Sequence, residues 1–127
     1  MASVKSKNTK PELIIRQILF KQGFRYRLYV KKLPGSPDIV LSKYKTVIFI
    51  NGCFWHGHKK CKKANLPKTN VDFWKEKIES TKIRDKNKIK ILKSLGWHCL
   101  ICWECYINKN RYSFLIDDNG YLKLILT

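Results

Sequence analysis

The sequence contains no long apolar run. No stretch approaches the ~18 consecutive apolar residues that a transmembrane helix needs, and the polar residues 1–10 lack the apolar segment of a signal peptide. We therefore expect a soluble, intracellular protein that does not associate with membranes.

Acidic residues are scarce. Nine Asp and Glu stand against 27 Lys and Arg, which gives a formal net charge of +18. This excess favours a polyanionic partner over an acidic small molecule, because distributed positive charge gains affinity by releasing counterions from phosphates. Internal repeats, low-complexity tracts and a convincing linker are also missing. We expect residues 1–127 to form a single domain and the protein to be a monomer.

The chain has five Cys, an odd number. In a reducing compartment their spacing favours metal ligation over disulfides. Cys53 and Cys61 bracket two histidines, His56 and His58, and Cys105 follows far downstream. Two thiolates, an imidazole and a distant third thiolate can complete a tetrahedron around zinc. The spacing alone allows either histidine to be the fourth ligand.

Hydrophobic periodicity predicts a mixed α and β fold. One amphipathic helix is expected to begin near Thr9 and to end at Gly23, and a longer one to begin near Thr69 and to end at Gly96. Strands are predicted over residues 24–30, 38–41, 46–50, 97–103, 114–116 and 121–124, the last two joined by a hairpin turn. Two further cysteines within the fourth of these strands, Cys99 and Cys102, are expected to be small core residues.

Several motifs together resemble the very short patch repair endonucleases. The resemblance covers roughly residues 7–108, and Cys-Phe-Trp-His beside a metal ligand, with Trp-Glu-Cys downstream, is more specific than any single Cys or His. The segments that carry it are 8–12 (NTKPE), 23–27 (GFRYR), 33–38 (LPGSPD), 47–58 (VIFINGCFWHGH), 73–74 (FW), 96–97 (GW) and 103–105 (WEC).

The resemblance implies an α/β fold with a PD-(D/E)xK-like restriction endonuclease core, in which helices flank a central mixed sheet beside a structural zinc site. Residues 1–8 would form a short N-terminal arm and residues 109–127 a C-terminal extension that holds the hairpin. The implied activity is nicking of one DNA strand on the 5′ side of the thymine in a T:G mispair, which arises when 5-methylcytosine is deaminated.

Asp38 is the candidate ligand of a catalytic cation. Hydrolysis of a phosphodiester calls for a hard cation, and Mg²⁺ usually takes one or two carboxylates while it retains waters. The alternative is a structural Asp in a Pro-Asp turn. The resemblance favours the metal, with Asp38 bridging magnesium ions. It also implies that a backbone carbonyl, here that of Ile50, replaces the second carboxylate of the motif.

The resemblance also distinguishes the two histidines. It implies that the zinc ligands are Cys53, His58, Cys61 and Cys105, and that His56 activates or orients the attacking water, a task suited to a group that titrates near neutral pH. Asn51 departs from the family, some members of which have a second active-site His there. An amide can hydrogen-bond a water or a phosphate but cannot act as a base near pH 7.

Glu12 has two competing interpretations. Thr9 and Glu12 have the spacing of a capping box, in which the carboxylate would reach back to the helix N-terminus. The resemblance instead makes Glu12 an acidic neighbour of the active site that helps to hold metal-bound water. Both roles could hold together.

Two aromatics and a lysine cluster are the candidate DNA contacts. Phe54 and Trp55 are expected to enter the base stack at the mispair, although one ring could instead close the core over the zinc. The nearby lysines are expected to contact phosphates and are Lys59, Lys60, Lys62 and Lys63. The basic residues of the long helix are expected to form a solvated face and are Lys82, Arg84, Lys86, Lys88, Lys90 and Lys93.

We therefore expect a zinc-containing, Mg²⁺-dependent nuclease for T:G mismatched duplex DNA that works in the bacterial cytoplasm on the nucleoid. A functional link to a cytosine-5 DNA methyltransferase and to mismatch-repair proteins would follow. Family members usually have a longer leading segment that adds a side chain to the DNA wedge, so the short N-terminus is expected to affect mismatch specificity more than hydrolysis. The alternatives are a related nuclease of other specificity, such as a mobile-element enzyme, and a noncatalytic zinc-containing DNA-binding module.

Overall fold

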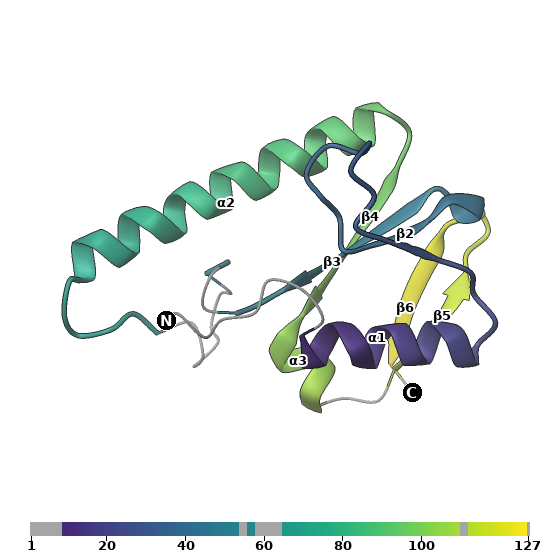
Figure 1. The fold of residues 1–127 in the computed structure, drawn as a ribbon, viewed down its shortest axis with the longest axis horizontal. Coiled ribbons are helices and arrows are strands. Elements are labelled where there is room, and N and C mark those ends of the chain that lie inside the picture. Colours follow the sequence, from purple (N-terminus) through teal and green to yellow (C-terminus); the bar gives the residue numbers. More distant parts are fainter. Residues whose placement is uncertain (1–8, 54–55, 58–64, 110–111, 127) are drawn as a thin grey trace.

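The computed structural model describes residues 9–53, 56–57, 65–109 and 112–126 (Figure 1). Its elements in chain order are α1 (Lys10–Lys21), β1 (Arg27–Leu28), β2 (Ile39–Leu41), the 3-10 helix η1 (Ser42–Tyr44), β3 (Thr46–Asn51), α2 (Val71–Ser94), β4 (His98–Trp103), α3 (Glu104–Lys109), β5 (Tyr112–Ile116) and β6 (Leu122–Leu126). The predicted mixed α/β fold with a central mixed sheet is confirmed. Within these ranges, no helix is both long and apolar enough to cross a bilayer.

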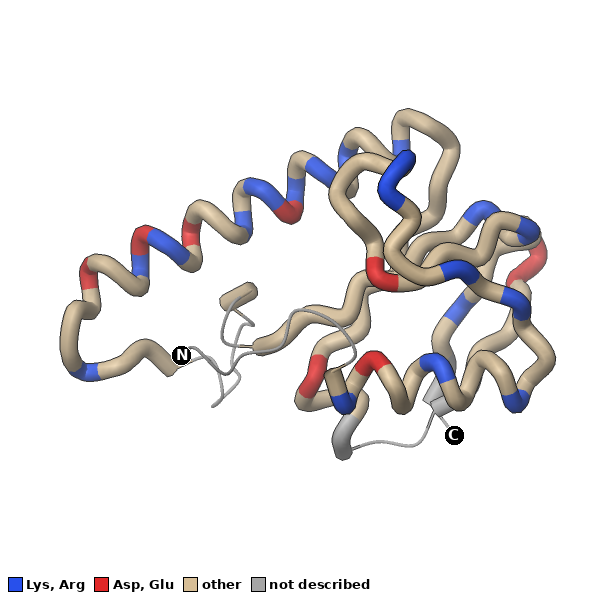
Figure 2. Tube along the Cα trace, viewed as in Figure 1, with Lys and Arg blue, Asp and Glu red and all other residues tan. Residues whose placement is uncertain are grey.

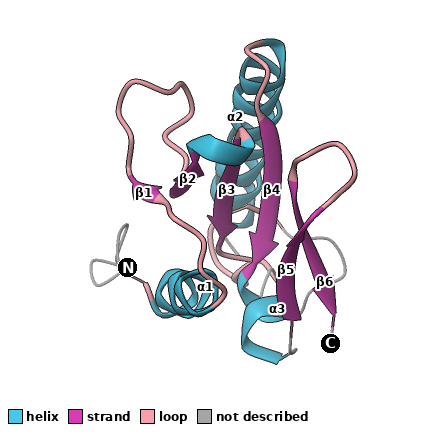
Figure 3. Ribbon diagram, turned by 90° about the vertical axis from the view of Figure 1, so that its right-hand side faces the viewer, coloured by secondary structure: helices cyan, strands magenta, loops and turns pink. Residues whose placement is uncertain are grey.

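The central sheet has the strand order β1-β2-β3-β4 (Figure 3). Strand β3 pairs antiparallel with β2, where Ile39 lies opposite Ile48, and parallel with β4, where Ile50 lies opposite Cys102. Two parallel neighbours cannot be joined by a tight turn, so the chain needs a crossover, which contains α2. The continuous apolar sequence of β3 fits a strand that is covered on both faces.

Strand β1 is shorter than the alternating pattern of residues 24–30 predicts. Only Arg27 and Leu28 pair with β2. Tyr29 has a left-handed backbone (φ 51°), which directs the chain out of the strand. The left-handed turn ends the strand, and the side chain of Tyr29 then bonds to α1 rather than following the alternation of the strand.

Alternation along β3 divides the core into two layers. Ile48 belongs to a cluster with Ile15 and Leu19 of α1, while Val47 and Phe49 point to the opposite face and pack with Leu92 of α2. Figure 1 shows α2 along one side of β3 and β4, with α1, α3 and the β5-β6 hairpin on the other side. We call these the α1 face and the α2 face of the sheet.

The α1 face is closed by the hairpin, which lies where the sequence indicates one. Strands β5 and β6 pair antiparallel. Gln22, just after α1, bonds the backbone of Phe114 twice: its Nε2 donates to the carbonyl oxygen at 2.7 Å, and its Oε1 accepts from the N–H at 2.8 Å. Thr46 Oγ1 accepts the N–H of Leu122 at 3.2 Å. The side chains of Gln22 and Thr46 thus attach the β5-β6 hairpin to the rest of the fold.

The α2 face is less filled. Of the 24 residues of α2, only Ile78 and Leu92 are buried. The helix ends just before Gly96, which has a left-handed backbone (φ 91°) as the predicted stop requires. Acidic and basic positions are interspersed along α2 as far as Asp85, and every charged position of the helix after Asp85 is basic (Figure 2). The sparsely packed face is therefore most basic along the C-terminal part of α2.

Candidate active site

Asp38 lies at the entrance of β2, between α1 and α2. Its backbone N–H donates to the carbonyl of Ile48 at 3.1 Å, and its Oδ2 accepts the N–H of Ile50 at 2.7 Å. In an extended strand the N–H and C=O of one residue point to the same side. The Ile50 carbonyl therefore also faces the Asp38 side of β3, beyond the end of β2, so that the Asp38 carboxylate and this carbonyl oxygen lie on the same side of the strand.

Burial is the main influence on the Asp38 carboxyl, and it raises the pKa to about 6. The hydrogen bond from Ile50 lowers the pKa, the nearby negative charge of Glu12 raises it, and the positive charges of Lys88 and Arg16 lower it. A carboxylate kept this far from water carries a desolvation cost that a bound cation would relieve. The donor set, one carboxylate with a carbonyl beside it, fits the preference of Mg²⁺ for oxygen ligands.

Glu12 is held in a buried network and not at the helix terminus. Its side chain is 4% exposed, and its Oε2 accepts from Tyr29 Oη at 2.5 Å and from Arg16 at 3.0 Å. Arg16 also donates to Tyr29 Oη at 2.7 Å. Thr9 is the N-cap residue, but it makes no side-chain capping bond. The Thr9 half of the predicted capping box is therefore not formed, and Oε2 of Glu12 is instead engaged by Arg16 and Tyr29.

His56 is paired with an acidic residue of α2 that sequence analysis did not identify. Its Nδ1 lies 2.6 Å from Oδ2 of Asp85, and its ring meets the indole of Trp103 edge-on, with centroids 6.4 Å apart. A carboxylate can only accept, so Nδ1 carries the hydrogen and Nε2 of a neutral ring is left as an acceptor. Asp85 is the last acidic residue of α2 before a run of lysines, which was the only signal in the sequence.

Gly57 allows the His56 loop to reach α2. Its backbone is left-handed (φ 59°), and a Cβ at this position would collide with Ile78 and Lys82 of the helix. Any other residue would therefore have to move the loop outward. The hydrogen bond between His56 and Asp85 depends on this close approach.

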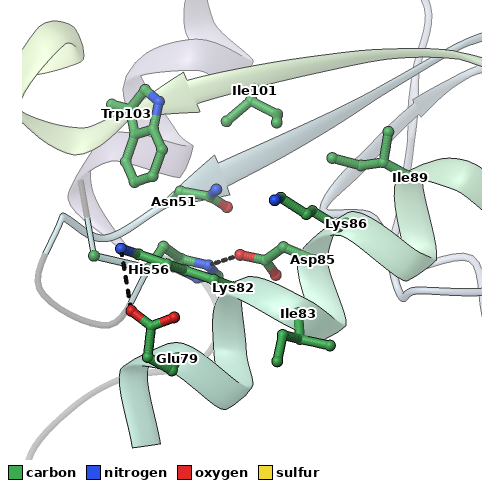
Figure 4. A pocket seen from close by; sticks show the side chains of 11 residues that line it. Asn51, His56, Glu79, Lys82, Ile83, Asp85, Lys86, Ile89, Ile101 and Trp103 are labelled. Atoms are coloured by element: carbon green, nitrogen blue, oxygen red, sulfur yellow. Dashed lines mark hydrogen bonds and ion pairs between the residues drawn. The ribbon is translucent and has the colours of Figure 1, made fainter. Parts of the chain in front are cut away.

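A pocket of about 500 Å³ lies between α2 and the ends of β3 and β4 (Figure 4). Asn51 lines it next to His56 and is 5% exposed. Trp103 and Ile101 form its apolar wall, and α2 contributes charged side chains on the opposite side. The pocket thus combines an imidazole, an amide and an aromatic surface, groups that can hold a phosphate or a water and the adjoining sugar or base.

Two of the four predicted zinc ligands fall within the described residues. Cys53 is fully buried, and its backbone N–H donates to Oε1 of Glu104 at 3.4 Å, which connects it to the residue before Cys105. Both thiols are free of disulfides. His58 and Cys61 lie outside the described residues. Among those that are described, no three His, Cys, Asp or Glu side chains gather as a metal site.

Cys102 is 1% exposed in the core on the α1 face, as predicted, and burial raises the pKa of its thiol to about 12. It therefore stays protonated at neutral pH in the absence of a metal ion. Cys99 is only half-buried, and burial raises the pKa of its thiol as well.

The predicted DNA contacts lie outside the described residues and are Phe54, Trp55, Lys59, Lys60, Lys62 and Lys63. Of the helix lysines, Lys86, Lys90 and Lys93 are exposed as expected. Lys88 is not: its side chain is 23% exposed and lies 3.2 Å from Oδ1 of Asp85. The prediction of a solvated basic face is therefore wrong at Lys88, because the side chain of this residue lies over the sheet.

Comparison with known proteins gives a consistent family. The family described as DNA mismatch endonuclease Vsr matches residues 1–63. The type II nicking enzyme V.NmeAIP of Neisseria meningitidis is 51% identical over 111 residues, which cover 87% of this chain and 78% of the relative. The DNA mismatch endonuclease Vsr of Escherichia coli is 41% identical over 105 residues, covering 83% and 67%. The nicking enzyme V.XorIIP of Xanthomonas oryzae is 44% identical over 108 residues, covering 85% and 79%.

Proposed function

The chain belongs to the Vsr family of DNA mismatch endonucleases and is a DNA endonuclease, and we propose that it nicks one strand of duplex DNA 5′ of the thymine in a T:G mispair. The observation that carries this proposal is the His56–Asp85 pair beside α2, which Lys88 links to Asp38 because Lys88 pairs with Asp85 and its charge acts on the Asp38 carboxyl. In the proposal, the candidate metal ligand and the oriented imidazole serve one phosphodiester.

We propose that Asp38 and the carbonyl of Ile50 hold Mg²⁺. The bond from Ile50 N–H to Asp38 Oδ2 fixes the carboxylate against the strand and leaves Oδ1 for a ligand. When bound there, the cation would polarise a nonbridging phosphate oxygen and stabilise the leaving oxygen. The PD-(D/E)xK-like core is part of the same proposal, since the Asp opens one strand and the carbonyl ends its neighbour.

In the proposed reaction, His56 orients the attacking water and takes its proton at Nε2. Asp85 fixes the tautomer that leaves Nε2 as an acceptor and stabilises the ring once it is protonated. Asn51 lines the same pocket and would donate a hydrogen bond to the phosphate or to the water. Glu12, buried near Asp38 with Arg16 and Tyr29, would help to hold the water of the cation.

A structural zinc ion is the second proposed cofactor. Cys53 and Cys105 would bind it together with His58 and Cys61, and the bond between Cys53 N–H and Glu104 supports this set because it holds two distant ligand segments together. When bound, the zinc would supply folding energy without taking part in hydrolysis. It would fix the start of the loop that carries His56.

DNA binding is proposed to use the net charge of +18, with the loop lysines on phosphates and Phe54 and Trp55 in the base stack. The enzyme would act on the nucleoid in the bacterial cytoplasm. Because T:G mispairs arise from 5-methylcytosine, the proposal links it to a cytosine-5 DNA methyltransferase and to mismatch-repair proteins that process the nick.

A strand-labelled nicking assay on otherwise identical T:G, A:T and G:C duplexes tests the proposal. Wild type should nick only the T strand of the T:G duplex, and only with Mg²⁺. Asp38→Ala and His56→Ala should lose nicking while zinc content, measured on each purified protein, stays at one ion per chain. Equal cutting of all three duplexes would point to a nuclease of other specificity. Salt-dependent DNA binding without any nicking would point to a noncatalytic module.

A further inference from the structure

Lys88 has a different environment from the other lysines of α2. Its ammonium group lies 4.4 Å from the centroid of the Phe49 ring and 3.2 Å from Oδ1 of Asp85. By contrast, Lys82 lines the pocket and pairs at 3.7 Å with Glu79, whose side chain is 59% exposed. An exposed pair contributes little to any fixed geometry. Lys88 instead places its ammonium group over the sheet, against the Phe49 ring and Asp85.

Lys88 and His56 share one carboxylate. Asp85 gives Oδ2 to Nδ1 of His56 and Oδ1 to the ammonium of Lys88, so both oxygens are engaged and the carboxylate plane is fixed. If only one oxygen of Asp85 were bound, the carboxylate could rotate about its Cβ–Cγ bond, and the imidazole of His56 would move with it. Partners of this indirect kind determine the orientation and tautomer of a working histidine.

The stem of Lys88 also contacts the loop that leads to Asp38. A Cβ built on Gly35 would lie 2.6 Å from Cβ of Lys88, so the helix and the loop are in close contact there. Gly35 has a left-handed backbone (φ 78°) and cannot be replaced without strain. The positive charge of Lys88 also acts on the Asp38 carboxyl. One side chain therefore meets both halves of the site.

We propose that Lys88 is a positioning residue that fixes the His56–Asp85 pair relative to the Asp38 loop by its ion pair with Asp85 and its packing on Phe49 and Gly35. The inference rests on the proposed function for its kinetic consequence, because only then do Asp38 and His56 act on the same phosphate. Its structural part, the orientation of the imidazole, does not depend on the substrate.

The first experiment compares Lys88→Met with Lys90→Met, which removes the same charge from an exposed position of the same helix. Single-turnover nicking of a T:G duplex, DNA affinity by fluorescence anisotropy and thermal unfolding are measured on both. We expect Lys88→Met to slow nicking by roughly 10- to 100-fold, with DNA affinity and unfolding temperature like those of Lys90→Met. Equal nicking rates in the two variants would overturn the proposal, and so would a rate loss explained by weaker DNA binding.

A double-mutant cycle tests whether Lys88 acts through Asp85. In the Asp85→Asn background, Lys88→Met should reduce the nicking rate far less than in wild type, because the carboxylate to be oriented is already gone. Effects that multiply independently would show that Lys88 acts elsewhere and would overturn the proposal.

A spectroscopic measurement separates this proposal from the proposed function. The ring nitrogen shifts of ¹⁵N-labelled His56 are recorded without DNA and without added Mg²⁺. In Lys88→Met we expect the Nδ1–H signal to broaden or to exchange faster, and in Lys90→Met to stay as in wild type. An unchanged signal in Lys88→Met would refute the positioning role. If wild type fails to nick T:G duplexes, the proposed function fails while this result still decides the role of Lys88.

Discussion

The two faces of the central sheet differ in how they are filled. On the α1 face, a helix of 12 residues buries four of them, and the hairpin and α3 complete the layer. On the α2 face, a helix of 24 residues buries two, and the space around them holds His56, Asn51 and charged side chains of α2. The α1 face provides most of the buried apolar packing and the α2 face provides the His56 part of the candidate site, while Glu12 of α1 lies near Asp38 at the edge of the sheet.

The difference follows from the alternation of a single strand. In β3, Ile48 supplies the α1 face and its neighbours Val47 and Phe49 supply the α2 face, where the last residue, Asn51, is polar. A polar group at the end of a central strand costs stability unless something binds it. The strands of the sheet thus pack apolar side chains along their length, and the polar group Asn51 lies at the end of β3, where α2 forms the other side of the pocket.

The largest effect that would sharpen this comparison is on the α2 face, at Asp85. Asp85→Asn should lower the nicking rate by roughly 10² to 10⁴-fold, because an amide can hold the wrong tautomer of His56. It should change the free energy of unfolding by less than about 1 kcal/mol. The exposed Glu76→Gln is the matched control on the same helix. Urea unfolding together with single-turnover rates checks both, and a parallel loss of stability and activity would break the division between the faces.

The next effect is on the α1 face, at Leu19. Leu19 is fully buried against the sheet, and Leu19→Ala should lower the free energy of unfolding by about 2 to 5 kcal/mol. Ile91→Ala on α2, where Ile91 is 48% exposed and away from the pocket, should change it by less than about 1 kcal/mol. Urea titrations measure both. If the folded Leu19→Ala protein nicked DNA more slowly than Ile91→Ala, the two faces would not be separable.

A substitution at Asp38 is expected to raise the free energy of unfolding, by less than Leu19→Ala lowers it. Because burial raises its pKa from 3.8 to about 6, the folded state holds the proton more tightly than the unfolded chain. The associated stability is present below pH 4 and is lost as the pH rises through 6. Asp38→Asn should therefore stabilise the Mg²⁺-free protein at pH 8 by roughly 1 to 3 kcal/mol and give little gain at pH 4. Thermal unfolding across this pH range checks it, and a variant that is less stable at pH 8 contradicts it.

Local patterns predicted the elements but not their contacts. Strand β3 and the end of α2 could be predicted because a buried strand is a continuous apolar run and a left-handed helix terminus favours glycine. Nothing in the sequence indicates the left-handed backbone of Tyr29, because tyrosine fits the alternating pattern of residues 24–30. The prediction of β1 was therefore too long. The helix α3 was not predicted either, since six residues carry no period.

Within the candidate site, sequence could name residues but not pair them. Asp38 and His56 stand in recognisable motifs, whereas Asp85 is 29 positions from His56 and joins it only through the rotation of α2 and the approach of Gly57. The same rotation takes Lys88 inward while Lys86 and Lys90 stay exposed. Glu12 had the spacing of a capping residue, and nothing in the sequence indicated that the fold brings Tyr29 close enough to donate a hydrogen bond to it.

The smallest expected effect concerns how the α1 face is closed, at Gln22. Its amide replaces a strand neighbour for Phe114, accepting its N–H and donating to its carbonyl. Gln22→Ala removes two hydrogen bonds where water can partly replace them, so the free energy of unfolding should fall by about 1 kcal/mol. Gln17→Ala on the exposed side of α1 is the control, with almost no change. Hydrogen exchange at the Phe114 amide localises the effect. In Gln22→Ala the exchange of this amide should be faster, while the His56–Asp85 pair stays intact. Unchanged exchange would mean that the hairpin is held by its apolar side chains alone.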